Sequence, residues 1–161
     1  MNIELQIIRI LREETNQMGS PYVVFVSGIE SVESHNTQTN RFVTSFGKKY
    51  PVKSFKYSEK NQISDFLNNN KVIALVLFSA GCGLANRFNF PSNKIYCIEP
   101  YNKNKNRAGI FASIPANNMF INSKSYPRGA GTKEGNVNLT NNFGNHFDAL
   151  SKSAAIISGR L

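Results

Sequence analysis

Residues 79–83, Ser-Ala-Gly-Cys-Gly, bring a hydroxyl and a thiol together with two glycines in one short stretch. Serine and cysteine side chains can serve as nucleophiles in covalent catalysis, and glycines permit a sharp turn that lets a ligand approach the backbone. Four residues that suit a helix follow the stretch, namely Leu84, Ala85, Arg87 and Phe88. A helix beginning there would offer unpaired N–H donors, so the sequence predicts that a ligand is held at this corner.

The segment that must position this corner is residues 72–78, an unbroken apolar run rich in β-branched residues. Such a run is typical of a strand buried on both faces in the middle of a parallel sheet. The alternating residues 52–57 indicate a half-buried edge strand. Further strands are predicted at 22–26, 94–98 and 118–122, with a short strand or turn at 110–114, and helices at 2–17, 34–47, 62–67 and 146–157.

Strands that alternate with helices predict the α/β class. We expect one domain over residues 1–161, a three-layer sandwich with a mostly parallel five-stranded sheet in the order 2-1-3-4-5. We also expect an amphipathic helix within residues 1–20, before the sheet, and a long glycine-rich loop at 123–145. In this strand order the winding reverses between strands 22–26 and 72–78, so residues 27–28 should face residues 79–81 across a crevice.

The chain order Ser79, Glu99, His146 resembles that of the α/β-hydrolases. In that family a serine on a strand-to-helix turn is followed by an acid after a later strand and by a histidine near the carboxyl end. Residues 79–81, Ser-Ala-Gly, match the second half of the family's Gly-x-Ser-x-Gly elbow, and Leu77 stands in place of its first glycine. In topology the resemblance covers about residues 22–158.

The resemblance implies a small serine hydrolase acting on an ester or an amide. Ser79 would attack the substrate, His146 would carry the proton and Glu99 would orient the imidazole. The backbone N–H groups of Ala80 and Gly28 would form the oxyanion hole. We expect no cofactor, and no metal, because the sequence has no Cys-x-x-Cys and no paired-histidine spacing.

Cys82 invites comparison with the glutamine amidotransferases, whose nucleophile lies in Gly-x-Cys-x-Gly on a similar turn. Here the glycines at 81 and 83 are one place out of step with that motif. We therefore predict that Cys82 packs as a small apolar side chain, and that Cys82 and Cys97 are reduced, buried thiols.

A flavodoxin-like protein would use the same strand order to bind a flavin or another phosphate-bearing ligand. The loop after strand 22–26 is rich in hydroxyl and amide side chains that could hold a phosphate at the start of the following helix, namely Ser31, Ser34, Asn36, Thr37 and Thr39. This alternative stays open, although no glycine-rich phosphate signature is present.

A formal net charge of +9 is compatible with nucleic-acid binding, but lysines and arginines are spread over several loops and strand ends without a dense block. The sequence therefore does not favour nucleic acid as a partner. The first residues lack the pattern of a secretory signal, and the longest apolar run, about seven residues, is too short to cross a bilayer. We expect no membrane association and a cytoplasmic location.

A non-catalytic function is the second hypothesis. Asparagine, lysine and isoleucine are abundant, as in proteins from AT-rich genomes, and a virus or phage is one ordinary source of such a composition. In this hypothesis the chain is a structural component of a virus particle that keeps the α/β sheet as a scaffold. It would bind neighbouring protein subunits through residues 1–20 and 123–145.

Overall fold

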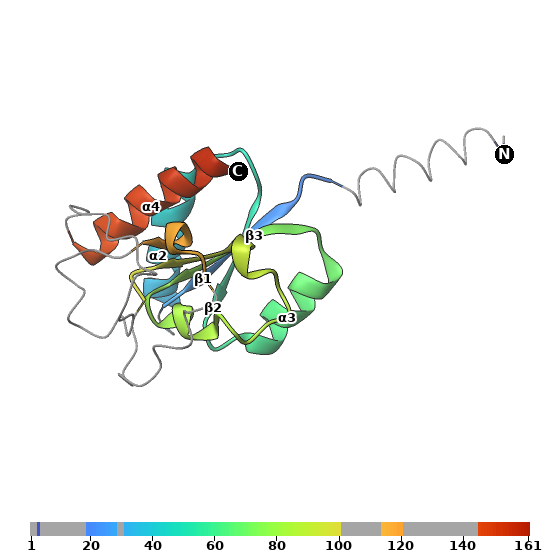
Figure 1. The fold of residues 1–161 in the computed structure, drawn as a ribbon, viewed down its shortest axis with the longest axis horizontal. Coiled ribbons are helices and arrows are strands. Elements are labelled where there is room, and N and C mark those ends of the chain that lie inside the picture. The colour runs from blue at the N-terminus through green and yellow to red at the C-terminus, as the bar shows by residue number, and fades with distance from the viewer. Residues whose placement is uncertain (1–2, 4–18, 29–30, 101–113, 121–144) are drawn as a thin grey trace.

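The computed structural model describes residue 3 and residues 19–28, 31–100, 114–120 and 145–161. These residues form a five-stranded sheet in the order β2-β1-β3-β4-β5, and every pair of neighbouring strands is parallel. Helices cover the sheet (Figure 1). The predicted α/β class, the parallel sheet and the strand order 2-1-3-4-5 are confirmed.

The strands have the lengths and burial that their composition predicts. The central strand β3 is buried along almost its whole length, whereas in β2 at the edge Phe55 alone is buried, Lys53 is exposed and the other three residues are half-buried. The bounds of the strands are β1 Tyr22–Ser27, β2 Val52–Lys56, β3 Val72–Phe78, β4 Ile95–Ile98 and β5 Met119–Phe120. The unbroken apolar run and the alternating run are therefore the central and edge strands, as predicted.

Helices α2 (Val32–Phe46) and α4 (His146–Arg160) lie side by side on one face of the sheet (Figure 1). The contact between α2 and the sheet includes Phe42, whose ring stacks on Phe25 of β1 with centroids 4.5 Å apart. Both rings are fully buried. Because aromatic side chains bury the largest apolar areas, this pair holds α2 firmly against β1.

Helix α3 (Lys60–Asn69) and the short 3₁₀ helix η1 (Ser79–Leu84) supply apolar side chains to the opposite face. Ile63 of α3 and Cys82 of η1 are both fully buried there, in one cluster with Leu77 and Cys97 from the sheet. The sheet is thus covered on both faces, which accounts for the apolar character of its inner strands.

The prediction of an α-helix after β3 is wrong. The chain forms the 3₁₀ helix Ser79–Leu84, which gives way to a turn. Gly81 and Gly83 are poor helix formers, and Leu84 is drawn into the core. This corner therefore lacks the α-helix that was expected to present its N–H groups to a ligand.

Several predicted segments fall outside the described residues. They include the helix at 2–17, of which Ile3 alone is described, the loop at 123–145, and most of the segment 110–114. The remaining helices were predicted close to their observed bounds. Gly47 ends α2 with φ 84°, a left-handed conformation that glycine adopts without strain.

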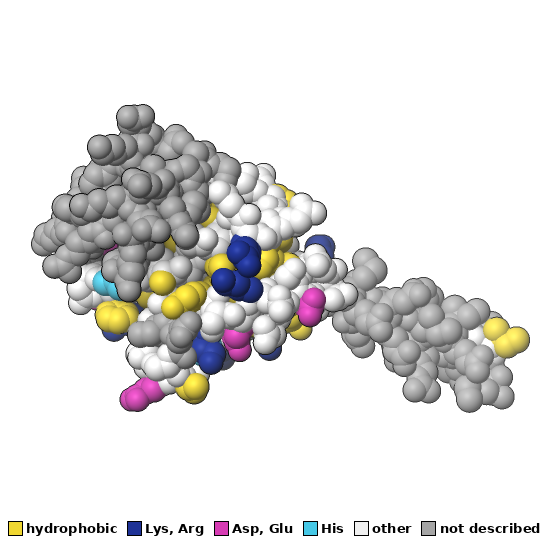
Figure 2. Space-filling view, turned by 90° about the horizontal axis from the view of Figure 1, so that it is seen from below, with side chains coloured by type: hydrophobic (Ala, Val, Ile, Leu, Met, Phe, Trp, Pro, Cys, Tyr) yellow, Lys and Arg dark blue, Asp and Glu magenta, His cyan; other side chains and the backbone are white. Residues whose placement is uncertain are grey.

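The described surface is mixed in character. On the face shown in Figure 2, lysine and arginine side chains lie in separate places between apolar and uncharged polar groups. None of the described helices combines the length and the apolar character that a membrane-crossing helix needs.

Candidate functional site

The carboxyl ends of β1 and β3 meet at one edge of the sheet. Val26 pairs with Leu77, so the chain leaves both strands at the same level. A Cβ added to Gly28 would lie 2.6 Å from the Ser79 Cβ, 2.7 Å from the Phe78 carbonyl oxygen and 3.0 Å from the Ala80 nitrogen. Residues 27–28 therefore pack directly on the turn that carries Ser79, with no space between the two backbones for even one methyl group.

The backbone of Ser79 turns sharply as it leaves β3. Its φ of 54° is in the left-handed region, which costs a non-glycine residue about 1–2 kcal/mol. Leu77, two residues earlier, is fully buried in the core on the α3 side of the sheet. Leu77 stands where the α/β-hydrolase motif has its first glycine, and it packs in the core as an ordinary strand residue. The left-handed turn occurs at Ser79.

Glu99 follows β4 in the same way that Ser79 follows β3. It is the second described non-glycine residue with a positive φ, 48°, and its N–H donates to the Phe120 carbonyl over 2.7 Å. Only 3% of the residue is exposed. A buried carboxylate on a constrained backbone is costly unless nearby groups stabilise it, so its position calls for a partner.

His146 lies beside this carboxylate. It is the first residue of α4, and Asn145 caps the helix by accepting from the N–H groups of Phe147 and Asp148. His146 Nδ1 lies 3.9 Å from Glu99 Oε2, and the imidazole rests against the Phe78 ring with centroids 4.7 Å apart. About 39% of the histidine side chain is exposed.

The three predicted catalytic residues therefore share one edge of the sheet. Glu99 and His146 are in contact. His146 also lies against the ring of Phe78, the residue that directly precedes Ser79. Among the described side chains, Ser79 Oγ makes no hydrogen bond to His146 in this structure. Catalytic hydrogen bonds are often long without substrate and tighten when it binds.

The two predicted oxyanion donors differ in their surroundings. The N–H of Gly28 donates to Gln38 Oε1 of α2 over 3.0 Å, so this N–H is directed toward the helix. The nitrogen of Ala80 packs against Gly28, since a Cβ added to Gly28 would lie 3.0 Å from it.

A second serine–histidine contact lies at the end of β1, and sequence reasoning missed it. Ser27 Oγ and His35 Nδ1 are 2.6 Å apart. Burial lowers the pKa of His35, with Glu59 opposing the shift and Lys56 adding to it, so the imidazole is neutral near pH 7. The Ser27 hydroxyl also donates to the Phe55 carbonyl over 3.5 Å. Ser27 is fully buried and no substrate can reach it, so the contact ties α2 to the sheet.

Cys82 is a buried thiol. It is fully buried and donates to the Leu77 carbonyl over 3.3 Å. Burial raises the pKa of Cys82 well above its usual value, and the nearby Cys97 thiol raises it further, so Cys82 stays protonated. The prediction that Cys82 packs as a small apolar side chain is confirmed.

The loop before α2 is used for helix capping. Ser31 caps α2 by accepting from the Ser34 N–H, and Thr37 donates to the Glu33 carbonyl. Glu33 adds a negative charge to the first turn, which disfavours an anion there. Phosphate or flavin binding at Ser31, Ser34, Asn36, Thr37 and Thr39 stays a prediction.

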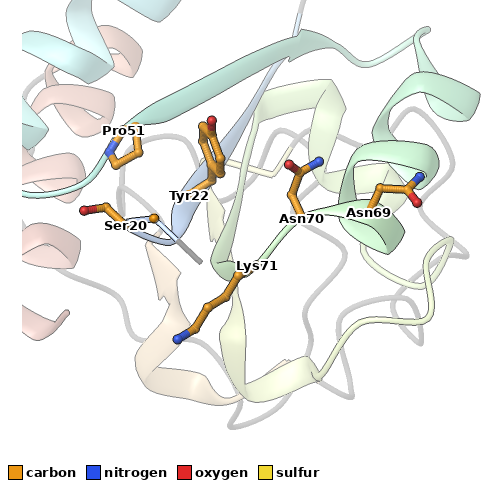
Figure 3. A pocket seen from close by; sticks show the side chains of 7 residues that line it. Ser20, Tyr22, Pro51, Asn69, Asn70 and Lys71 are labelled. Carbon is orange, nitrogen blue, oxygen red and sulfur yellow. The ribbon is translucent and has the colours of Figure 1, made fainter. Parts of the chain in front are cut away.

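An open pocket of about 570 Å³ lies at the other edge of the sheet (Figure 3). It is formed where β1 and β3 begin and where α3 ends, by Ser20, Tyr22, Pro51, Asn69, Asn70 and Lys71 among others. Parallel α/β sheets hold their ligands at the carboxyl ends of the strands. This pocket is therefore separate from the site at Ser79.

Within the described ranges, no group of three or more histidine, cysteine or acidic residues could hold a metal ion. Comparison with known proteins adds no identity, because no protein family, no curated protein and no solved structure matches the chain.

Proposed function

We propose that this protein is a small serine hydrolase, similar to a minimal α/β-hydrolase, that cleaves an ester or an amide. Ser79 is the nucleophile, His146 the general base and Glu99 the acid that orients the histidine. The contact between Glu99 and His146 carries the proposal, because it joins a buried carboxylate to a partly exposed imidazole beside the turn of Ser79.

The side of the imidazole that meets the carboxylate supports these roles. In serine hydrolases the acid contacts Nδ1 of the histidine, which leaves Nε2 to take the proton from the serine. Here Nδ1 is the nitrogen that lies 3.9 Å from Glu99. The left-handed backbone of Ser79 adds support, since a nucleophile elbow is a strained turn that exposes its serine above the sheet.

The reaction would proceed in two balanced steps. Ser79 Oγ attacks the carbonyl carbon while its proton passes to His146 Nε2, and the resulting tetrahedral oxyanion is met by the Ala80 N–H. The C–O or C–N bond breaks as the leaving group takes the proton from His146. Water then attacks the acyl-serine, giving its proton to His146, and the acid departs as Ser79 recovers a proton.

Glu99 stabilises the imidazolium in each step. Its negative charge is held by a backbone that cannot easily move, in an environment from which water is largely excluded. An opposite charge is felt more strongly there than in bulk water. The N–H of Gly28 is bound to Gln38, so the proposal gives Gly28 the role of letting β1 pack closely on the turn.

Hydrolysis of p-nitrophenyl esters with short and medium acyl chains tests this proposal. The wild type should hydrolyse at least one of them, and both Ser79→Ala and His146→Asn should lower kcat by about 10³-fold or more. Ser92→Ala, which removes an exposed hydroxyl from the 3₁₀ helix Ser92–Lys94, is the matched control and should keep full activity. Equal activity in Ser79→Ala and the wild type would refute the proposal.

An assembly function is the second candidate, in which the chain is a structural component of a virus particle. Exposed apolar side chains on the α2–α4 face favour it, since Val43, Phe147 and Ile156 are each more than a third exposed. Residues 1–20 and 123–145 would bind neighbouring subunits. Sedimentation velocity tests this candidate, because self-association that Phe147→Ser weakens supports it and a monomer at all concentrations argues against it.

A further inference from the structure

We propose that Gln38 is a positioning residue for Ser79, acting through the backbone of Gly28. The inference rests on the proposed hydrolase function for its catalytic consequence. Gln38 lies on α2, contacts neither Ser79 nor His146 in any described interaction, and holds the N–H of Gly28.

The contact between Gln38 and Gly28 is well protected. The hydrogen bond is 3.0 Å long, and only 5% of Gln38 is exposed. Gly28 itself is half-buried. An N–H that is partly shielded from water loses free energy when its acceptor is removed, because water replaces the partner only in part. Gly28 therefore has one strongly preferred position, which the side chain of Gln38 defines.

Gly28 packs directly against the turn formed by Phe78, Ser79 and Ala80, so its position affects that of Ser79. A Cβ on Gly28 would come within 3.0 Å of Phe78, Ser79 and Ala80, so the two backbones are in close contact. A shift of Gly28 toward the turn is blocked, and a shift away opens a gap beneath Ser79. Packed groups at this distance move together.

His35 provides a second anchor on the same helix. It precedes Gln38 by three residues, a spacing that places both side chains on one face of α2. His35 holds the Ser27 hydroxyl at 2.6 Å, while Gln38 holds the next residue along the chain. Two side chains of α2 thus hold consecutive residues at the end of β1, and Phe42 packs the helix onto that strand.

The test uses Gln38→Met, which keeps the length of the side chain but removes the acceptor, and Gln38→Glu, which retains an acceptor oxygen. Gln62→Met on the exposed surface of α3 is the matched control. Hydrogen exchange of the Gly28 amide, followed by NMR, should be about tenfold or more faster in Gln38→Met. Exchange should stay near the wild-type rate in Gln38→Glu and in Gln62→Met.

Kinetics test the catalytic consequence. Gln38→Met should lower kcat for the best ester about 10–100-fold with KM changed less than about threefold, because the nucleophile is displaced while the substrate surface remains. Gln38→Glu should restore most of kcat. Unchanged Gly28 exchange, or unchanged kcat in a folded Gln38→Met, would overturn the inference. If Gln38→Met does not fold, Gln38→Ala takes its place in both measurements.

Failure of the hydrolase function is distinguishable from failure of this inference. If the wild type hydrolyses no ester, the NMR chemical shifts of the Ser79 and Ala80 amides still test whether Gln38 positions this turn. They should shift in Gln38→Met and stay in place in Gln62→Met, because only the first change releases Gly28. Unshifted Ser79 and Ala80 resonances in Gln38→Met would contradict the inference.

Discussion

Gly28→Ala is the substitution that most sharply perturbs the predicted site. The added methyl carbon would lie 2.7 Å from the Phe78 carbonyl oxygen and 2.6 Å from the Ser79 Cβ, whereas ordinary contacts begin at 3.4 Å. Relieving the contact with Phe78 alone, from 2.7 Å to 3.4 Å, requires a displacement of about 0.7 Å. Because backbone atoms are involved, no side-chain rotation can provide it.

The displacement has two measurable costs. Overpacking in a close-packed region destabilises a protein by about 1–3 kcal/mol, so the free energy of unfolding should fall by about that amount. A nucleophile displaced by about 0.7 Å loses its alignment with the substrate, and kcat should fall by about 10-fold to 10²-fold. The loss of activity should persist at temperatures where the variant is fully folded.

Gly83→Ala is the matched control for this prediction. Gly83 lies in the same 3₁₀ helix as Ser79, and a Cβ added to it meets no atom within 4 Å. Urea unfolding followed by circular dichroism, together with ester kinetics, should separate the two variants clearly. If Gly28→Ala matches Gly83→Ala in both stability and kcat, the close packing of β1 on the nucleophile turn is refuted.

Three further predictions follow from single contacts. His35→Gln should flatten the pH dependence of stability. The folded state lowers the pKa of His35, so below about pH 6.5 the unfolded wild type binds more protons than the folded protein and stability falls. Urea unfolding at about pH 7.5 and at about pH 5 should show that acidification destabilises the wild type more than the variant. Glu99→Gln should lower kcat by about 10²-fold or more while the unfolding midpoint changes little, because the amide keeps the shape and loses the charge beside His146. Phe42→Ala should lower the free energy of unfolding by about 3–5 kcal/mol in urea, since a buried stacked ring is lost, and a loss below about 1 kcal/mol would contradict the packing of α2 on β1.

The sheet could be predicted from the sequence because burial leaves a strong pattern. Residues 72–78 are apolar without interruption and form the central strand, whereas residues 52–57 alternate and contain the edge strand. The order 2-1-3-4-5 was predicted as the simplest arrangement of five parallel strands, and the structure confirms it. Glu99 and Ser79 could be placed at one edge for the same reason, since each follows a predicted strand.

The contacts of α2 could not be predicted in this way. His35 and Gln38 are polar residues on a helix whose apolar pattern marks only Phe42, Val43 and Phe46, and nothing in their types shows that they reach the end of β1. Their spacing of three residues was the one available signal. The 3₁₀ helix at 79–84 was likewise missed, because the two glycines were interpreted as a turn before a helix that would begin at Leu84.

Covalent labelling tests the central claim most directly. The wild type, incubated with a fluorophosphonate probe and digested, should carry one adduct on the peptide that contains Ser79, and the adduct should be absent in Ser79→Ala and strongly reduced in His146→Asn. Tandem mass spectrometry assigns the modified residue. A folded wild type that acquires no adduct, or one modified at another serine while Ser79 stays free, would contradict the proposed hydrolase site.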